Sequence, residues 1–190
     1  MNNIRNYIEK LWGLEIFTSL VKFQREDGYK KRYKDPIEIT DENIESVDFD
    51  NYDFLVIDLA KSNLICLDIE GHSNSVTDFY QFLEKERIDI RSLSVEKTMN
   101  NGLHLYFRNT SYTPIEHWNG FGDIHYDILN KRSFTSPSSF DGKYYEWMYN
   151  PFKNMKTRNG IQTIPRWISY MLSKSTKYFT PDSKQSSTLK

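Results

Sequence analysis

Two carboxylates stand at alternate positions inside an apolar stretch of the chain, Leu64 to Glu70. Successive side chains of a β-strand point to opposite faces, so Asp68 and Glu70 project together while Leu67 and Ile69 face a core. Carboxylates beside a buried strand cost free energy unless a cation or a hydrogen-bonding partner compensates them. Two adjacent oxygen donors suit a hard divalent ion such as Mg²⁺ or Mn²⁺. The stretch therefore predicts a strand that presents metal ligands on one face.

Two later apolar stretches each carry one polar residue that suits the same site. His104 lies in the alternating segment Leu103–Arg108, and Asp127 lies in Ile124–Leu129. Gly102, just before the first segment, would let the backbone approach a ligand closely. If the strand of Asp127 lies beside the strand of the acidic pair, three carboxylates meet, and such a set holds the two metal ions used for in-line phosphoryl transfer. Taken singly, each signal also fits a structural histidine or an exposed acidic strand face.

The overall composition limits the class of protein. With 190 residues, the chain is long enough for one domain with a substantial core and short for two. Its formal net charge of −1 leaves no global basic field, so any nucleic-acid surface has to be local. Cys66 is the single cysteine, which excludes a disulfide within the chain and a cysteine-based zinc site. No apolar run is long enough to span a bilayer and the N-terminus lacks a secretion-signal pattern, so we expect a soluble, cytoplasmic protein with no membrane partner.

Periodicity and turn residues predict one α+β domain over residues 1–172 with a mainly antiparallel sheet, followed by a polar, frayed tail over residues 173–190. The turn composition of residues 60–63 predicts a hairpin between its two flanking strands, and Ser75 with Asp78 resembles a capping pair at a helix start. The expected helices cover residues 2–12, 40–47, a segment that begins at Ser75, and a segment that Pro165 opens; the expected strands cover residues 14–23, 54–58, 64–70, 93–98, 103–108, 124–129, 133–135 and 144–148.

Residues 24–35 form a polar, basic segment in which Lys30, Lys31, Arg32 and Lys34 cluster before a proline. A solvated loop is the favoured interpretation. The alternative is an arm that contacts phosphates, because tyrosines are interleaved with the charges.

As an ordered set, the segments Leu67–Glu70, Asn101–Phe107 and Tyr126–Ile128 resemble the three motifs of the archaeo-eukaryotic primase superfamily. The closest resemblance is to the bifunctional primase-polymerase (prim-pol) domain of phage, plasmid and mobile-element replication proteins. It covers roughly Phe54 to Leu172, whereas residues 1–53 match loosely. The family often has Ser-Gly-Gly before the histidine, where this chain has Asn100-Asn101-Gly102. Three further segments agree with the family, namely Thr135–Ser139, Tyr145–Trp147 and Ile164–Ile168.

The resemblance implies a prim-pol catalytic core with an RRM-like sheet flanked by helices. The implied activity is that of a template-directed nucleotidyltransferase, namely a DNA primase and DNA polymerase. Such an enzyme works with two Mg²⁺ or Mn²⁺ ions. The resemblance makes Asp68, Glu70 and Asp127 the metal ligands and His104 the contact to the triphosphate of the incoming nucleotide. The implied partners are a single-stranded DNA template, nucleoside triphosphates and a separate helicase or replication initiator, since this chain has no phosphate-binding loop of an ATP-driven helicase. Candidate contacts to the nucleotide or the leaving pyrophosphate are Lys97, Arg108, Lys131, Arg132 and Ser136.

Two other functions fit the same residues. One is a catalytically inactive primase-like module that binds single-stranded DNA or a replication partner, and the other is a metal-dependent nuclease. Among the remaining histidines, His72 lies close enough in sequence to the acidic pair to reach a metal or a phosphate. His117 and His125 lack the spacing of a zinc site and are expected to be structural or exposed.

Overall fold

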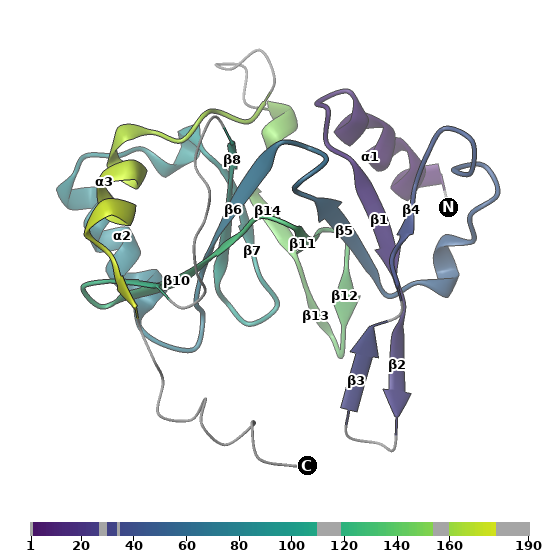
Figure 1. The fold of residues 1–190 in the computed structure, drawn as a ribbon, viewed down its shortest axis with the longest axis horizontal. Helices are drawn as coiled ribbons and strands as arrows, with labels where there is room; N and C mark the ends of the chain where they lie inside the picture. Colours follow the sequence, from purple (N-terminus) through teal and green to yellow (C-terminus); the bar gives the residue numbers. More distant parts are fainter. Residues whose placement is uncertain (1, 27–29, 34, 110–118, 154–159, 178–190) are drawn as a thin grey trace.

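The computed structural model describes residues 2–26, 30–33, 35–109, 119–153 and 160–177. Within these ranges the chain forms three α-helices and mostly antiparallel strands, which agrees with the expected α+β class (Figure 1). The helices are α1 (Asn2–Trp12), α2 (Ser75–Lys85) and α3 (Arg166–Lys174). The strands are β1 (Thr18–Val21), β2 (Phe23–Glu26), β3 (Lys30–Tyr33), β4 (Ile37–Glu38), β5 (Phe54–Asp58), β6 (Leu64–Ile69), β7 (Ser94–Lys97), β8 (Leu103–Arg108), β9 (Asn119–Phe121), β10 (Ile124–Leu129), β11 (Arg132–Thr135), β12 (Ser139–Phe140), β13 (Lys143–Tyr144), β14 (Glu146–Tyr149) and β15 (Thr176–Lys177).

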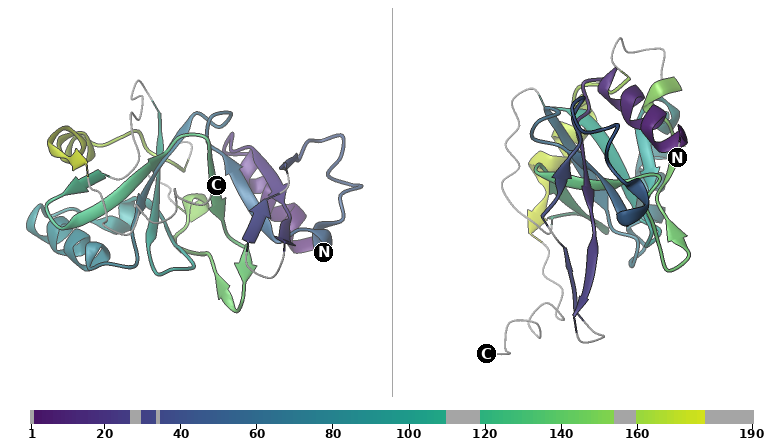
Figure 2. Two further views of the ribbon diagram at one scale, coloured as in Figure 1. Left: turned by 60° about the horizontal axis from the view of Figure 1, so that its bottom comes forward. Right: turned by 90° about the vertical axis from the view of Figure 1, so that its right-hand side faces the viewer.

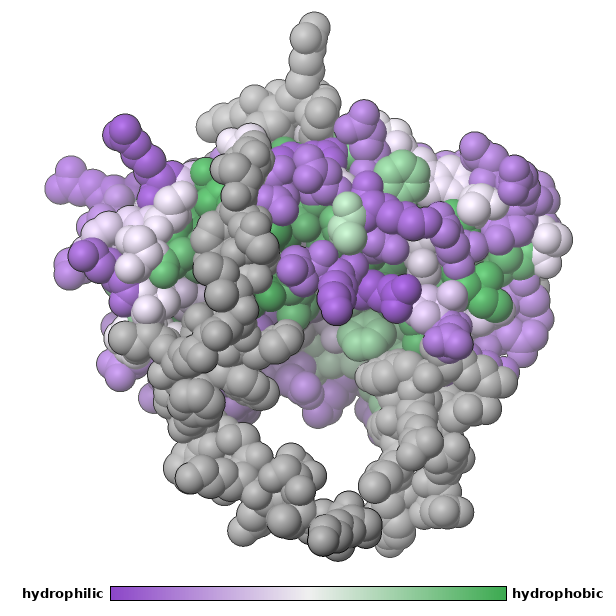
Figure 3. Space-filling view, viewed as in Figure 1, coloured by the Kyte–Doolittle hydropathy of each residue, from purple (hydrophilic) through white to green (hydrophobic). Residues whose placement is uncertain are grey.

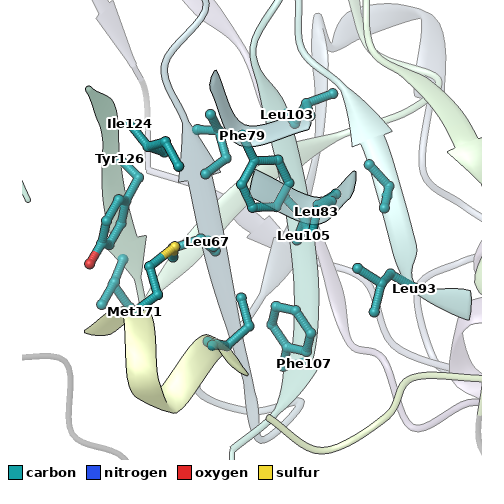
Figure 4. Packing of buried hydrophobic residues seen from close by; sticks show 14 of the residues in the cluster. Leu67, Phe79, Leu83, Leu93, Leu103, Leu105, Phe107, Ile124, Tyr126 and Met171 are labelled. Carbon is teal, nitrogen blue, oxygen red and sulfur yellow. The ribbon is translucent and has the colours of Figure 1, made fainter. Parts of the chain in front are cut away.

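The larger sheet has seven strands in the order β14-β7-β8-β6-β10-β9-β15. One of its faces packs against α2 and α3, because the odd-numbered residues of β6 and β8 are apolar and point to that side. Figure 4 shows Leu67, Leu105 and Phe107 from these strands packed near Phe79 of α2 and Met171 of α3. The prediction that Leu67 and Ile69 face a core is confirmed.

A second sheet has the order β11-β5-β1-β4 and carries α1. Its apolar side chains and those of α1 share a core with Leu64, Cys66 and Tyr106, which lie on the opposite face of the larger sheet. The two sheets therefore lie beside each other along the long axis of the molecule (Figures 1 and 2). Cys66 is buried in this core, as expected for a small apolar side chain. Much of the surface seen in Figure 3 is hydrophilic, with apolar groups showing between the polar side chains.

The N-terminal part differs from the expectation at two places. The strand expected over residues 14–23 begins at Thr18, because Leu14 and Ile16 instead donate backbone hydrogen bonds to Leu11 in a turn after α1. The favoured loop over residues 24–35 is wrong, since β2 and β3 pair as an antiparallel hairpin. Alternating polar residues satisfy a strand ladder as well as a loop, and local composition does not separate the two.

Two further local predictions are wrong. Residues 40–47 form successive turns and no helix, and the Asn43 side chain accepts a hydrogen bond from Thr40 N at 2.9 Å. Residues 60–63 do form a turn, but β5 and β6 belong to different sheets and do not pair. The hydroxyl of Ser62 accepts a hydrogen bond from Phe17 N at 2.9 Å, so the turn is bound to the start of β1.

From Ser75 onward, three details differ from the expectation. Ser75 does not cap α2: its hydroxyl accepts a hydrogen bond from His125 N at 2.9 Å and so joins the helix to β10. The strand expected over residues 144–148 is divided at Tyr145 into β13 and β14. The frayed tail expected from Ser173 is wrong as far as residue 177, because α3 continues to Lys174 and β15 pairs with β9. Residues 178–190 lie outside the described ranges, and in the part of the chain that is described no helix is long and apolar enough to cross a membrane.

Candidate functional site

Four ionisable residues form one row across the centre of the larger sheet. In the strand register, Glu96 of β7 pairs with His104 of β8, His104 pairs with Asp68 of β6, and Asp68 pairs with Asp127 of β10. Directly opposed residues of an antiparallel pair share a face, with Cβ atoms about 4.5–5.5 Å apart. The strand of Asp127 therefore lies beside that of Asp68, which was the condition for the two carboxylates to meet.

Glu70 lies beside this row, two residues after Asp68 along the chain. Glu70 follows β6 directly, and its backbone N donates to His125 O at 3.0 Å. Its side chain is 9% exposed and its Oε2 lies 2.8 Å from His72 Nε2 as an ion pair, yet that buried oxygen accepts no aligned hydrogen bond. Burial raises the pKa of Glu70; His72 opposes this effect, and the negative charge of Asp127 adds to it. The site thus holds a buried carboxylate oxygen that lies against His72 but accepts no hydrogen bond.

His104 is buried between two carboxylates. Its Nε2 lies 3.6 Å from Asp68 Oδ1 and its Nδ1 lies 3.5 Å from Glu96 Oε2. Burial alone lowers the pKa of His104, but hydrogen bonding to Asp68 and Glu96 and their negative charges outweigh it and raise the pKa to about 9. The imidazole is therefore a cation at neutral pH, and it offsets part of the negative charge of the row.

Glu96 is a site residue that sequence reasoning missed. It is 0% exposed, and its carboxylate accepts hydrogen bonds from Tyr106 Oη at 3.0 Å, Thr135 Oγ1 at 2.9 Å and Ser136 N at 2.6 Å. These donors satisfy a buried charge that would otherwise be costly. The available signal was weak, because only Val95 is apolar in β7 and no apolar run surrounds Glu96 as one surrounds Asp68.

Two cavities flank the pair formed by Asp68 and His104. A smaller cavity of about 230 Å³ is lined by the four residues predicted for the catalytic centre, Asp68, Glu70, His104 and Asp127. A larger cavity of about 510 Å³ lies between the two sheets. Tyr145 lines both cavities and stacks on His104 with ring centroids 5.6 Å apart and planes at 27°. The smaller cavity is lined by Asp68, Glu70, Gly71, His72, Thr98, Asn100, His104, Asp127 and Tyr145; the larger one by Val21, Asp35, Pro36, Val56, Asp68, His104, Leu129, Arg132, Ser133, Phe134 and Tyr145.

Gly102 does not leave room for a ligand in this structure. A Cβ atom on Gly102 would lie 2.4 Å from Ile69 O, and one on Gly71 would lie 2.0 Å from Asn100 O. The two glycines thus let the turn between β7 and β8 pack directly on the backbone that follows β6. The space that Gly102 provides is used by the protein's own backbone, and it fixes Asn100 at the edge of the smaller cavity.

The other predicted contact residues are divided between the site and more distant positions. Arg132 lines the larger cavity, and Ser136 reaches the site through its backbone N–H to Glu96. Lys97 and Lys131 are exposed and line neither cavity.

Arg108 is also outside the two cavities. Its guanidinium donates to Ser62 O at 2.8 Å and to Leu14 O, so it joins turns at the far end of β8. Of the other histidines, His72 is 64% exposed at the cavity edge and His125 is half-buried in β10. His117 lies outside the described residues.

The donor chemistry of the site fits a hard divalent ion. Asp68, Asp127 and Glu70 supply carboxylate oxygens around one cavity, and Glu70 Oε2 is buried without a hydrogen bond. As the side chains stand, no three His, Cys, Asp or Glu residues in the described ranges are arranged to hold a metal ion. Glu70 is instead paired with His72.

Fold and site together define an α+β protein with an acidic cavity on the central strands of an antiparallel sheet. A scan against protein-family models found no match, and a search of curated proteins found no significant match.

Proposed function

We propose that this protein is a template-directed nucleotidyltransferase, a DNA primase and DNA polymerase of the prim-pol type, in the replication of a phage, plasmid or mobile element. The observation that carries the proposal is the pairing of Asp127 with Asp68 across β10 and β6, beside His104 and above a cavity. Clustered carboxylates repel phosphates unless cations lie between them, so a surface that only binds nucleic acid gains nothing from this arrangement. The three motif segments named in the sequence supply the same residues.

In this proposal Asp68, Asp127 and Glu70 hold Mg²⁺ or Mn²⁺. Bound ions of this kind lower the pKa of a primer 3′-hydroxyl and neutralise charge on the triphosphate. For Glu70 to take part, its carboxylate has to leave His72 Nε2, which lies 2.8 Å away. The exposed His72 side chain is free to turn toward solvent when that happens.

The remaining residues orient the carboxylates and add positive charge. Glu96 holds the His104 imidazolium from one side, and His104 in turn faces Asp68, which fixes the position of that carboxylate. The contact of His104 with a triphosphate stays a prediction. Arg132, in the wall of the larger cavity, is the predicted cation best placed to contact the nucleotide or pyrophosphate.

The test is nucleotide incorporation on a single-stranded DNA template with Mn²⁺ or Mg²⁺ and labelled ribo- or deoxyribonucleoside triphosphates. We expect template-dependent products, and a loss of at least about 100-fold in the rate for Asp68→Asn and for Asp127→Asn. Asp123→Asn is the matched control, because Asp123 is an exposed aspartate in the turn just before β10. DNA binding without any product in the wild-type protein would instead support the inactive module, and shortening of labelled strands would support the nuclease.

A further inference from the structure

Two hairpins arise beside the larger cavity and project from the same side of the molecule. Val21 at the end of β1 and Asp35 and Pro36 after β3 line the cavity at the base of the β2–β3 hairpin. Tyr145, which follows β13 directly, lines it at the base of the β12–β13 hairpin. Val21, Phe140 and Tyr145 also belong to one apolar cluster, which joins the two bases. Both hairpins point to the lower side of Figure 1, and the right-hand view of Figure 2 agrees.

The β2–β3 hairpin concentrates positive charge that the rest of the chain lacks. Residues 22–34 include six basic and two acidic residues, in a protein whose formal net charge is −1. The two strands form a sheet of their own, in which Arg25 is the register partner of Lys31. The same register places Lys30 opposite Glu26, so the charge is not repulsive at every position, but the segment as a whole carries an excess of positive charge. A polyanion laid along the hairpin would neutralise that excess.

The β12–β13 hairpin presents an aromatic ring to solvent beside another lysine. Tyr144 is 58% exposed, and the preceding Lys143 is exposed as well. The hairpin is anchored to the rest of the protein at its base. Phe140 stacks on Phe54 of β5 with ring centroids 6.1 Å apart, and Tyr145 N donates a hydrogen bond to Ser138 O at 3.0 Å. An exposed tyrosine on an anchored hairpin is a platform on which an unpaired base stacks.

We propose that the β2–β3 and β12–β13 hairpins together bind single-stranded DNA and hold it across the mouth of the larger cavity. The basic residues that the sequence places in the β2–β3 hairpin supply positive charge for the phosphates, and Tyr144 stacks on a base. Basic residues that follow the backbone, combined with a stacking aromatic, are the means by which proteins hold single strands without reading sequence. This inference deepens the proposed function by naming the surface for the template, but binding itself requires no catalysis.

The first test measures the contribution of the charges. Affinity of the full chain for a fluorescently labelled oligo-dT is measured by anisotropy, without nucleotides and with EDTA, over a series of salt concentrations. Lys30→Gln/Lys31→Gln/Arg32→Gln is expected to weaken binding at least tenfold at low salt and to reduce the slope of log K against log salt by about 2. The matched control is Lys85→Gln/Arg87→Gln/Arg91→Gln, three exposed basic residues at and just after the end of α2, on the other side of the sheet. Equal affinities for the two triple variants would overturn the proposal, as would a wild-type protein that does not bind the oligonucleotide.

The second test measures stacking. Tyr144→Ala is expected to weaken binding about tenfold, whereas Tyr170→Ala serves as the control because that α3 tyrosine is 56% exposed. Equal effects of the two substitutions, or full competition by a sulfated polysaccharide at equal charge, would show a general polyanion surface and overturn the DNA assignment.

A final comparison separates this inference from the proposed function. The wild-type protein is measured in both the binding assay and the incorporation assay. A wild-type protein that binds the oligonucleotide but makes no template-dependent product would contradict the proposed function and leave the hairpin surface standing. Activity that survives unchanged in both hairpin variants would contradict the hairpin surface alone.

Discussion

Asp127 lies directly opposite Asp68 in the antiparallel pair of β10 and β6. Two like charges in this relationship cost free energy, so a sequence selected for stability alone would avoid the pair. His104, the neighbour of Asp68 on its other side, offsets part of that cost as a buried cation. The proposed metal site accounts for the pair, because a divalent ion between the two carboxylates would relieve their repulsion.

Glu96 should contribute strongly to the free energy of unfolding of the protein, because it holds the row of ionisable residues in place. Glu96→Gln removes the charge that faces His104 Nδ1, and its amide nitrogen cannot accept the hydrogen bonds that Tyr106, Thr135 and Ser136 donate to the carboxylate. We expect the free energy of unfolding to fall by about 2–4 kcal/mol, measured by urea denaturation in metal-free buffer. Glu146→Gln, at an exposed position of the neighbouring β14, should change it by less than about 0.5 kcal/mol. An unchanged unfolding midpoint for Glu96→Gln would refute the buried network.

The raised pKa of His104 predicts a loss of stability at alkaline pH. The folded-state pKa of about 9 lies above the ordinary value of 6.5, so the protonated imidazole stabilises the fold fully below pH 6.5 and this contribution disappears as the pH rises through 9. The loss is on the order of 3 kcal/mol. Urea unfolding with EDTA at several values of pH measures it, and His104→Gln, which cannot titrate, should give a flatter profile over the same interval. Parallel profiles for the two proteins would contradict the assignment.

Gly102 should tolerate no side chain. Gly102→Ala would bring a Cβ atom within 2.4 Å of Ile69 O, a backbone atom that cannot turn away. We expect a loss of about 1–3 kcal/mol in the free energy of unfolding, together with displacement of the turn that carries Asn100. Gly13→Ala is the control, since the nearest atom to its added Cβ would be at an ordinary 3.4 Å. Thermal denaturation measures the midpoint of unfolding of both variants. Equal midpoints for Gly102→Ala and Gly13→Ala would contradict the close packing at Gly102.

The sequence predicted the strands of the site better than their neighbours. The bounds of β8 and β10 are those expected from apolar alternation, Leu103–Arg108 and Ile124–Leu129, because each strand has one face buried under α2 and α3. Alternation gives no information about which strands pair, and so the turn at residues 60–63 suggested a hairpin that the structure does not form.

The same limit explains what was missed at the site. Glu96 lies close to His104 in sequence, but only the register across β7 and β8 places it directly opposite the imidazole. Tyr145 is distant from the three motifs in sequence, and no local pattern places its ring against His104. Residues 24–35 are mostly charged in the sequence and show no apolar alternation, so the pairing of β2 with β3 could not be predicted from pattern. Local patterns identify the residue types that a site needs, whereas their partners depend on long-range pairing.

Mn²⁺ binding followed by electron paramagnetic resonance tests the central claim most directly, because it reports on the carboxylates whether or not the protein has found its substrate. Our account predicts that the wild-type protein binds Mn²⁺, that Asp68→Asn and Asp127→Asn each weaken this binding at least about tenfold, and that Asp123→Asn leaves it unchanged. Binding that is equally strong in all four proteins, or absent in the wild-type protein, would contradict a shared metal centre at Asp68 and Asp127.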